Sequence, residues 1–235
     1  MLRKTRTGSG VIELQAVEYG YGSGTLLRDV SLTLPAGSFH FLTGPSGAGK
    51  TTLLKLCYLE LMATAGHVTV FGQDARRLDR TGIALARQKI GVVHQDCQFL
   101  DHLSVADNIA LPLTVSGRDD AARRKDVVDL LAWTGLTERA EARPPELSGG
   151  ERQRAALARA VVVSPDVILA DEPTGNIDWE MSLRLLQLLV ELNRLGKAIL
   201  IATHDLNLIR QAKSHVSARV LRLRAGRLEA GGADL

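Results

Sequence analysis

One stretch of the sequence decides the fold: Gly44-Pro45-Ser46-Gly47-Ala48-Gly49-Lys50-Thr51. It fits the pattern G-x-x-x-x-G-K-[ST], in which glycines let successive backbone N–H groups turn inward around an anion. An apolar run before it predicts a strand, and the residues from Lys50 to about Met62 predict a helix after it. This context favours a nucleoside triphosphate site over a simple glycine-rich turn. Lys50 would reach the β- and γ-phosphates and the Thr51 hydroxyl would bind Mg²⁺, and we count Thr52 among the nucleotide-binding residues.

A second motif follows another apolar run, Val167-Ile168-Leu169-Ala170, which is continued by Asp171 and Glu172. The carboxyl end of a parallel strand is where ligands bind in such sheets. Asp171 is therefore placed to hold magnesium through water, and Glu172 to polarise an attacking water. The alternative is an acidic pair that only ends a strand before Pro173, and the phosphate loop at residues 44–51 makes the catalytic interpretation the stronger one.

A third motif is Leu147-Ser148-Gly149-Gly150-Glu151. Ser148 and Glu151 have the spacing of a capping box, which predicts a helix at Glu151–Val163. A cap does not require two consecutive glycines, however, and Gly149 and Gly150 permit the close approach of a phosphate to the helix start. One nucleotide molecule can use both helix ends only if a symmetric second copy of the chain supplies one of them.

The rest of the chain predicts a layered α/β protein. Its 235 residues are 45% hydrophobic and 23% charged, typical of a globular chain that buries a sizeable core. Apolar alternation between residues 11 and 35 predicts antiparallel strands joined by the turn Gly20–Gly24. Further strands, separated by helical patterns, are predicted at residues 38–43, 67–71, 90–94, 167–170 and 198–202 and indicate a parallel sheet.

The predicted organisation is a flexible leader at residues 1–10 and a single domain at residues 11–235. Residues 98–145 break the alternation of strand and helix, and the pattern at residues 121–133 is that of an amphipathic helix. We expect this part to be an all-α subdomain inserted into the α/β core.

Charge and composition exclude several classes of protein. The net charge is +3, and Arg3, Lys4 and Arg6 in the leader account for it, so the body is formally neutral and no nucleic-acid partner is expected. No apolar stretch approaches the roughly 18 residues of a membrane span, and no secretory signal is recognised. Cys57 and Cys97 lie far apart without ligand or redox spacing, which favours a reduced, cytosolic chain.

Five features together resemble the nucleotide-binding domain of ABC ATPases: the phosphate loop, Gln95, Leu147–Glu151, Val167–Glu172 and His204. The resemblance runs from about Val11 to Arg227, with each motif in the family's order. It implies a P-loop α/β core with an antiparallel β subdomain and an inserted all-α subdomain. It also implies ATP and Mg²⁺ as ligands and hydrolysis of ATP to ADP and phosphate.

The resemblance assigns roles that the residues alone do not. Gln95 matches a glutamine that contacts magnesium and the lytic water and links to the helical subdomain. His204 matches the histidine that contacts the γ-phosphate. Tyr21 lies where the family stacks an aromatic ring on adenine, and Tyr19 is the rival for this place.

The family's homodimer is implied in the same way. Each of two ATP molecules would be held by Lys50 and Thr51 of one chain and by Ser148 and Gly150 of the other. Asp178 falls in the loop that crosses the dimer seam, although Gly175-Asn176-Ile177-Asp178 departs from the commoner Ser-Ala-Leu-Asp and leaves the partner of Asp178 open. Glu151 stands where glutamine is more frequent.

Three longer stretches, residues 41–50, 169–176 and 202–209, most closely resemble the members of this family that act in bacterial cell division. That finer resemblance implies an integral membrane partner resembling FtsX, a place at the cytoplasmic face of the inner membrane, and ATP-driven activation of septal cell-wall hydrolysis. Residues 171–176 are shared with lipoprotein-release and macrolide-efflux relatives, so the ATPase subunit of an exporter is the alternative. A soluble regulatory ATPase is a third interpretation.

Overall fold

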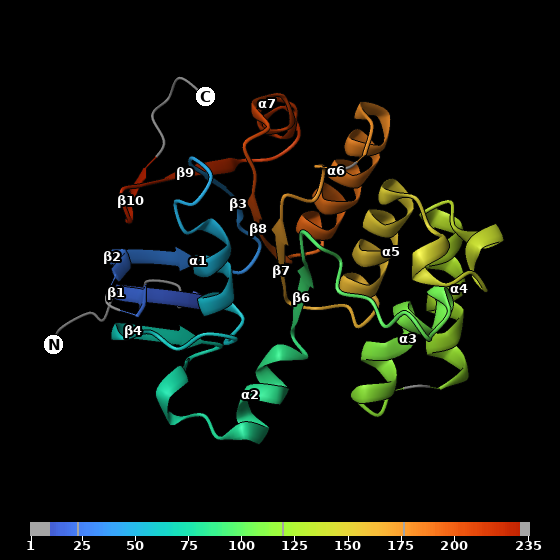
Figure 1. The fold of residues 1–235 in the computed structure, drawn as a ribbon, viewed down its shortest axis with the longest axis horizontal. Helices are drawn as coiled ribbons and strands as arrows, with labels where there is room; N and C mark the ends of the chain where they lie inside the picture. The colour runs from blue at the N-terminus through green and yellow to red at the C-terminus, as the bar shows by residue number, and fades with distance from the viewer. Residues whose placement is uncertain (1–9, 23, 119, 176, 231–235) are drawn as a thin grey trace, which may run out of the picture.

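The structure is a computed structural model that describes residues 10–22, 24–118, 120–175 and 177–230. The predicted leader, apart from Gly10, and Asn176 of the loop before Asp178 lie outside the described residues. Figure 1 shows an antiparallel sheet at one side, a mostly parallel sheet in the middle and a group of helices at the opposite side.

The antiparallel sheet has the strand order β2-β1-β4-β5. The predicted hairpin is confirmed, because β1 (Ile12–Tyr21) pairs with β2 (Gly24–Leu34). A Cβ atom at Gly20 would lie 2.1 Å from the Gly24 carbonyl oxygen, so the closing turn requires glycine there. The sheet is completed by β4 (Ala65–Val70) and β5 (Gln73–Asp74). The strand predicted at residues 67–71 corresponds to β4, so its assignment to the parallel sheet is wrong, because β4 pairs antiparallel with β1.

The central sheet has the order β10-β9-β3-β8-β7-β6. Four of its strands were predicted and pair in parallel, namely β3 (Phe39–Thr43), β6 (Ile90–Val93), β7 (Val167–Asp171) and β8 (Ala198–Ala202). The prediction missed two strands at one edge: β9 (Ala218–Arg224), parallel to β3, and β10 (Arg227–Ala230), antiparallel to β9.

Helices cover both faces of the central sheet (Figure 1). On one face, α1 (Lys50–Cys57) packs with the antiparallel sheet against alternate strand residues such as Leu42 and Leu169. The other face is covered by α5 (Gly149–Val161), α6 (Trp179–Arg194) and α7 (Leu206–Lys213). The strands are thus buried on both sides, which explains their continuous apolar runs.

The predicted end of the first helix at Met62 is wrong, because α1 ends at Cys57. Leu59 has a φ of +63°, and this left-handed conformation turns the chain out of the helix. The chain then runs to β4 and on through the short helix η1 (Ala75–Arg77) and α2 (Arg80–Arg87) to β6.

Between residues 98 and 145, where a helical subdomain is predicted, the described residues form helices and no strand. These are α3 (Val105–Val115), α4 (Ala121–Trp133) and the 3₁₀ helices η2 (Thr137–Arg139) and η3 (Pro144–Glu146). Side chains of α5 pack into the same apolar cluster as those of α3 and α4. Therefore α5 contacts both the sheet and the helical region, and it begins at Gly149, two residues before the predicted start. None of the helices in the described ranges is both long enough and apolar enough to span a bilayer.

Candidate active site

The phosphate loop connects β3 to α1, and its backbone depends on glycine. Gly44, Gly47 and Gly49 have φ values of 151°, 76° and 101°, which side chains of L-residues rarely adopt. A Cβ atom at Gly44 would also lie 2.4 Å from the Leu223 carbonyl oxygen on β9. The loop can therefore keep this shape only with glycine at these positions.

The N-terminus of α1 differs from that of every other α-helix in the described ranges. Gly49 is its N-cap residue and offers no side-chain acceptor to the first N–H groups of the helix. Each of the other six has a side chain that accepts a hydrogen bond from its first turn: Asp79, Ser104, Asp120, Ser148, Asp178 and Asp205. Uncapped N–H groups and the positive end of the helix dipole together favour an anion at the start of α1.

Lys50 adds a full positive charge to the same place. Its Nζ donates hydrogen bonds to the carbonyl oxygens of Gly44, at 2.9 Å, and Pro45, at 3.3 Å. The ammonium group thus lies across the phosphate loop, where a bound phosphate group would meet both the lysine and the backbone N–H groups.

A pocket of 460 Å³ opens beside this loop. It brings together the ends of β3, β6, β7 and β8, the edge at which ligands bind in parallel sheets. Its lining contains ten residues predicted from the sequence and also Leu26 and Gly175: Ser46, Gly47, Gly49, Lys50, Thr51, Thr52, Gln95, Asp171, Glu172 and His204. Leu26 was missed because an apolar residue of β2 carries no signal of ligand contact.

Asp171 is a buried carboxyl group at the end of β7, with 6% of its surface exposed. Burial raises its pKa, the hydrogen bond with Thr51 lowers it, the charge of Glu172 raises it and the charge of Lys50 lowers it, with a net increase. A carboxylate kept in this position at a cost in solvation is well suited to meet a cation.

The donor atoms around Asp171 fit Mg²⁺. The Thr51 hydroxyl, the Gln95 amide and the Asp171 carboxylate all supply oxygen, and all three residues line the pocket. Within the described ranges, no three His, Cys, Asp or Glu side chains form a cluster able to hold a metal ion. Mg²⁺ usually needs only one or two protein carboxylates when substrate phosphates complete its coordination shell. This donor set supplies one carboxylate, that of Asp171.

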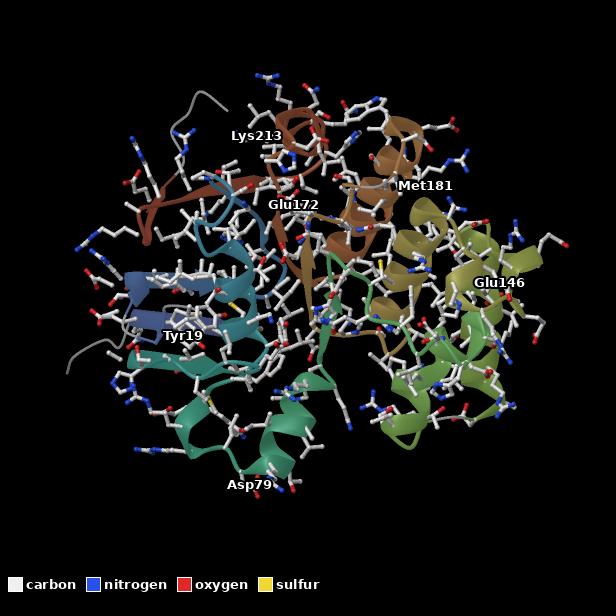
Figure 2. All side chains as sticks on the ribbon, in the orientation of Figure 1. Tyr19, Asp79, Glu146, Glu172, Met181 and Lys213 are labelled. Carbon is white, nitrogen blue, oxygen red and sulfur yellow. The ribbon has the colours of Figure 1, made fainter. Side chains whose placement is uncertain are left out.

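Glu172 and His204 contact each other at the ends of β7 and β8. The distance between His204 Nδ1 and Glu172 Oε1 is 3.0 Å, and the Glu172 side chain is 14% exposed while that of His204 is 78% exposed. Figure 2 places Glu172 near the centre of the molecule, between the strand side and the helical side. A sheltered carboxylate beside an exposed imidazole can accept a proton from a water molecule in the pocket.

The two candidate tyrosines lie outside the pocket lining. Tyr21 ends β1 and is 57% exposed, whereas Tyr19 is half-buried against the core. Their rings meet edge to face, with centroids 5.1 Å apart. Of the two, Tyr21 therefore has the more accessible ring for stacking.

The remaining predicted residues also lie outside this pocket. Ser148, Gly149 and Gly150 form the start of α5, and Asp178 caps α6 by accepting a hydrogen bond from the Met181 N–H at 2.9 Å. Within the phosphate loop, Ala48 is half-buried against the core. Gly44 and Pro45 line a neighbouring pocket of 340 Å³, together with His204, Arg222 and Arg224.

Comparison with known proteins gives consistent findings. Residues 27–175 match the family described as ABC transporter. The chain is 44% identical to the cell division ATP-binding protein FtsE of Haemophilus influenzae, over 86% of this chain and 93% of the relative. It is 43% identical to FtsE of Escherichia coli K12, over 94% and 98% of the two chains, and 38% identical to FtsE of Bacillus subtilis, over 88% and 92%.

Solved structures give the same picture. The chain resembles a bacterial ABC transporter cassette, MJ0796, solved as a dimer, with a TM-score of 0.85 and 34% identity over 93% of this chain and 96% of the other. A dimeric post-hydrolysis form of that cassette bound to ADP and phosphate gives a TM-score of 0.84 with 32% identity over 93% and 98% of the two chains.

Proposed function

The chain belongs to the ABC transporter family and hydrolyses ATP, and from this premise we propose that it is the ATPase subunit of a membrane complex in bacterial cell division. The ATPase activity is supported by one observation. Five predicted residues line the same pocket: Lys50, Thr51, Asp171, Glu172 and His204. The role in cell division is supported by the FtsE relatives, which match nearly the whole chain at 38–44% identity.

Phosphate binding is the first step of the proposed mechanism. The N–H groups of the phosphate loop and α1, together with Lys50, bind and orient the β- and γ-phosphates of ATP. Thr51, Gln95 and Asp171 would hold Mg²⁺, which when bound neutralises charge on the phosphate oxygens. The Tyr21 ring stacks on the adenine.

Hydrolysis then uses the pair at the ends of β7 and β8. Glu172 accepts a proton from a water molecule as the water oxygen forms a bond to the γ-phosphorus and the bond to the β–γ bridging oxygen breaks. His204, in contact with Glu172, stabilises the γ-phosphate through its imidazole. The products are ADP and inorganic phosphate.

A homodimer completes each site in this proposal. Ser148 and Gly150 of the second copy contact the ATP that is held by Lys50 of the first copy, and Asp178 lies at the seam. The dimeric cassettes that resemble this chain support this arrangement. ATP then holds the dimer closed, and hydrolysis releases it.

A groove lined in part by His94 and Gln98, which flank the Gln95 segment in the sequence, is our candidate binding site for the membrane partner. It has a volume of 490 Å³ and is walled by Leu111, Pro112 and Val115 of α3. Its Val115 is 76% exposed, so the groove presents an apolar wall to a partner. We assign it to a cytoplasmic helix of an integral membrane protein resembling FtsX, which would hold this chain at the cytoplasmic face of the inner membrane.

Arg159 of α5 connects that groove to the segment that follows Gln95. It lines the groove, its guanidinium donates to the main-chain carbonyls of Cys97 and Gln98, and it stacks on the Phe99 ring with the guanidinium carbon 4.6 Å from the ring centroid. A helix seated in the groove would thus contact the residue that holds the Gln95 segment. Movement of this segment during the ATP cycle would move the partner and activate septal cell-wall hydrolysis.

The division role is tested by purifying the full chain from detergent-solubilised membranes and identifying the proteins that co-purify. Recovery of an FtsX-like protein supports the proposal. Recovery of a lipoprotein-release or macrolide-type permease would overturn the division role and leave the ATPase assignment intact. That alternative rests on the resemblance of residues 171–176 to those exporters.

The role of Glu172 is tested by Glu172→Gln, which removes the proton acceptor and keeps the shape of the side chain. We expect ATP turnover to fall about 100-fold or more while ATP binding persists. ATP should also shift this variant to a dimer in size-exclusion chromatography. Glu180→Gln, at an exposed position of α6, is the matched control and should turn over at the wild-type rate. Near-normal turnover of Glu172→Gln would contradict the assignment.

A further inference from the structure

Gln153 is a buried polar residue of α5 with a contact that packing does not explain. It lies five residues after the helix cap Ser148 and is 1% exposed. Its side-chain amide nitrogen donates to the main-chain carbonyl of Glu172 at 3.3 Å. Its amide oxygen is buried without a hydrogen-bond partner among the described residues. An unpaired buried oxygen costs free energy, so an apolar side chain of similar volume would suit packing better than glutamine.

The other end of this hydrogen bond is a main chain held in an unusual conformation. Glu172 has a φ of +45°, in the left-handed region that residues other than glycine rarely adopt. Its N–H donates to the Ala202 carbonyl at 2.9 Å, and its own carbonyl accepts from the Gly175 N–H at 3.1 Å as well as from Gln153. The backbone that directs the Glu172 carboxylate is therefore fixed by contacts from β8, from the following loop and from α5.

These contacts connect the N-terminal part of α5 to the peptide of Glu172. Ser148 caps the N-terminus of α5, and Gln153, within the second turn of the helix, donates directly to the Glu172 carbonyl. A helix of 13 residues moves as a rigid unit, so a displacement at its N-terminus reaches the Glu172 carbonyl through one side chain.

We propose that Gln153 is a positioning residue that holds the Glu172 carbonyl and thereby directs the Glu172 carboxylate toward the attacking water. The inference deepens the proposed function, because it rests on Glu172 as the proton acceptor. Gln153 itself touches neither the nucleotide nor the reacting atoms. Its effect on catalysis is exerted through the conformation of Glu172.

The test compares full-length wild type with Gln153→Met, which keeps the volume and removes both the donor and the unpaired oxygen. We expect kcat for ATP with Mg²⁺ to fall about tenfold, KM for ATP to change less than about twofold, and Tm to stay within about 3 °C. Gln187→Met on the exposed surface of α6 is the matched control and should leave all three unchanged. A second variant, Gln153→Leu, also removes the N–H donor and places an apolar side chain at this buried position, and it should lower kcat with KM unchanged.

A structural role predicts a different pattern. If both Gln153 variants kept wild-type kcat, or if kcat fell only together with a loss of Tm and a rise in KM, the positioning role would be wrong. A further readout uses the Glu172→Gln background, in which ATP-driven dimerisation reports binding without hydrolysis. There Gln153→Met should leave the dimer fraction unchanged, and a loss of dimerisation would instead assign Gln153 to the interface.

The two proposals fail separately. If Glu172→Gln turned over near the wild-type rate, the role of Glu172 would be wrong and the role of Gln153 would fall with it. If Glu172→Gln lost turnover and both Gln153 variants kept it, only the inference about Gln153 would be overturned.

Discussion

The N-termini of α1 and α5 both follow glycine-containing motifs that predict phosphate contact, yet they are built differently. At α1 the cap position is Gly49, which leaves the first N–H groups without a side-chain acceptor. At α5 the Ser148 hydroxyl accepts from the Glu151 N–H at 3.2 Å, and Glu151 accepts from the Ser148 N–H at 2.8 Å. Arg139 adds an ion pair to Glu151 at 3.1 Å.

In the proposed homodimer, the α1 end is the primary phosphate site and the α5 end is contributed by the second copy. The α1 end needs an anion to satisfy its N–H groups and has Lys50 and the pocket beside it. The α5 end is stable in the single chain and lies outside that pocket. Since the Ser148 hydroxyl uses a lone pair for the cap, its O–H proton remains available to a phosphate on a second chain. The comparison therefore supports the proposed homodimer, in which the α1 end of one copy binds ATP and the α5 end of the other completes the site.

The largest effect is expected at the α1 end. Lys50→Ala removes a charge-assisted contact to phosphate, so affinity for ATP should fall by about one to two orders of magnitude and turnover should be lost. Isothermal titration with ATP and Mg²⁺ measures the first effect. Lys125→Ala, at an exposed lysine of α4, is the control and should bind like wild type. Equal affinity of Lys50→Ala and wild type would remove the distinction between the two helix ends.

At the α5 end we expect a smaller effect on turnover and a separate, modest loss of stability. Ser148→Ala should leave ATP binding by the single chain nearly unchanged, lower turnover about tenfold through the lost phosphate contact, and cost about 1 kcal/mol of stability through the lost cap. Ser104→Ala is a close match, because Ser104 caps α3 by accepting from the Asp107 N–H at 3.0 Å. It should lose similar stability and keep full turnover. If both variants lost turnover equally, the α5 end would be only a helix cap.

The smallest expected effect is a change in thermal stability. Its sign differs between Asp171, in the pocket beside α1, and Glu151, in the first turn of α5. The raised pKa of Asp171 means that its ionised form destabilises the folded chain at pH values above that pKa. Asp171→Asn should therefore raise Tm by about 2–4 °C at neutral pH while abolishing magnesium-dependent turnover. The gain should shrink as the pH falls and the wild-type carboxyl becomes protonated.

Glu151 provides the opposite case. Hydrogen bonds from Ser148 lower its pKa, so its carboxylate stabilises the fold at neutral pH and loses that contribution as the pH falls through the lowered pKa. Glu151→Gln should lower Tm at neutral pH. Thermal unfolding of both variants without nucleotide checks the two signs, and a fall in Tm for Asp171→Asn would contradict the account of Asp171.

Much of the fold follows from local patterns. The continuous apolar runs predict β7 and β8 to within one residue, and the spacing of polar and apolar residues predicts α4 with the observed bounds. The strand β9, which lies between β3 and the edge strand β10, was missed because Arg219, Arg222 and Arg224 interrupt its apolar residues. These three arginines are exposed in the folded chain, which their sequence positions do not indicate. The early end of α1 depends on the left-handed Leu59, which no local signal indicates.

The candidate site also contains residues that the sequence predicts and residues that it does not. Ten of the residues that line the pocket were predicted, most of them from short motifs and Gln95 and His204 from the resemblance to the family. Gln153 has no such signal, because its partner is a main-chain carbonyl 19 residues away that only tertiary packing brings to it. The left-handed backbone of Glu172 is equally invisible in the sequence, since glutamate rarely adopts that conformation.

The most direct test of the central claim mixes two inactive chains. Lys50→Ala damages the α1 end, and Ser148→Asp keeps a cap on α5 while placing a negative charge toward the phosphate. If each ATP lies between the α1 end of one copy and the α5 end of the other, a mixed dimer contains one intact site. Turnover of the mixture should then rise well above the sum of the two variants alone. No increase, in a mixture where mixed dimers are detected by differential tags, would contradict the shared site.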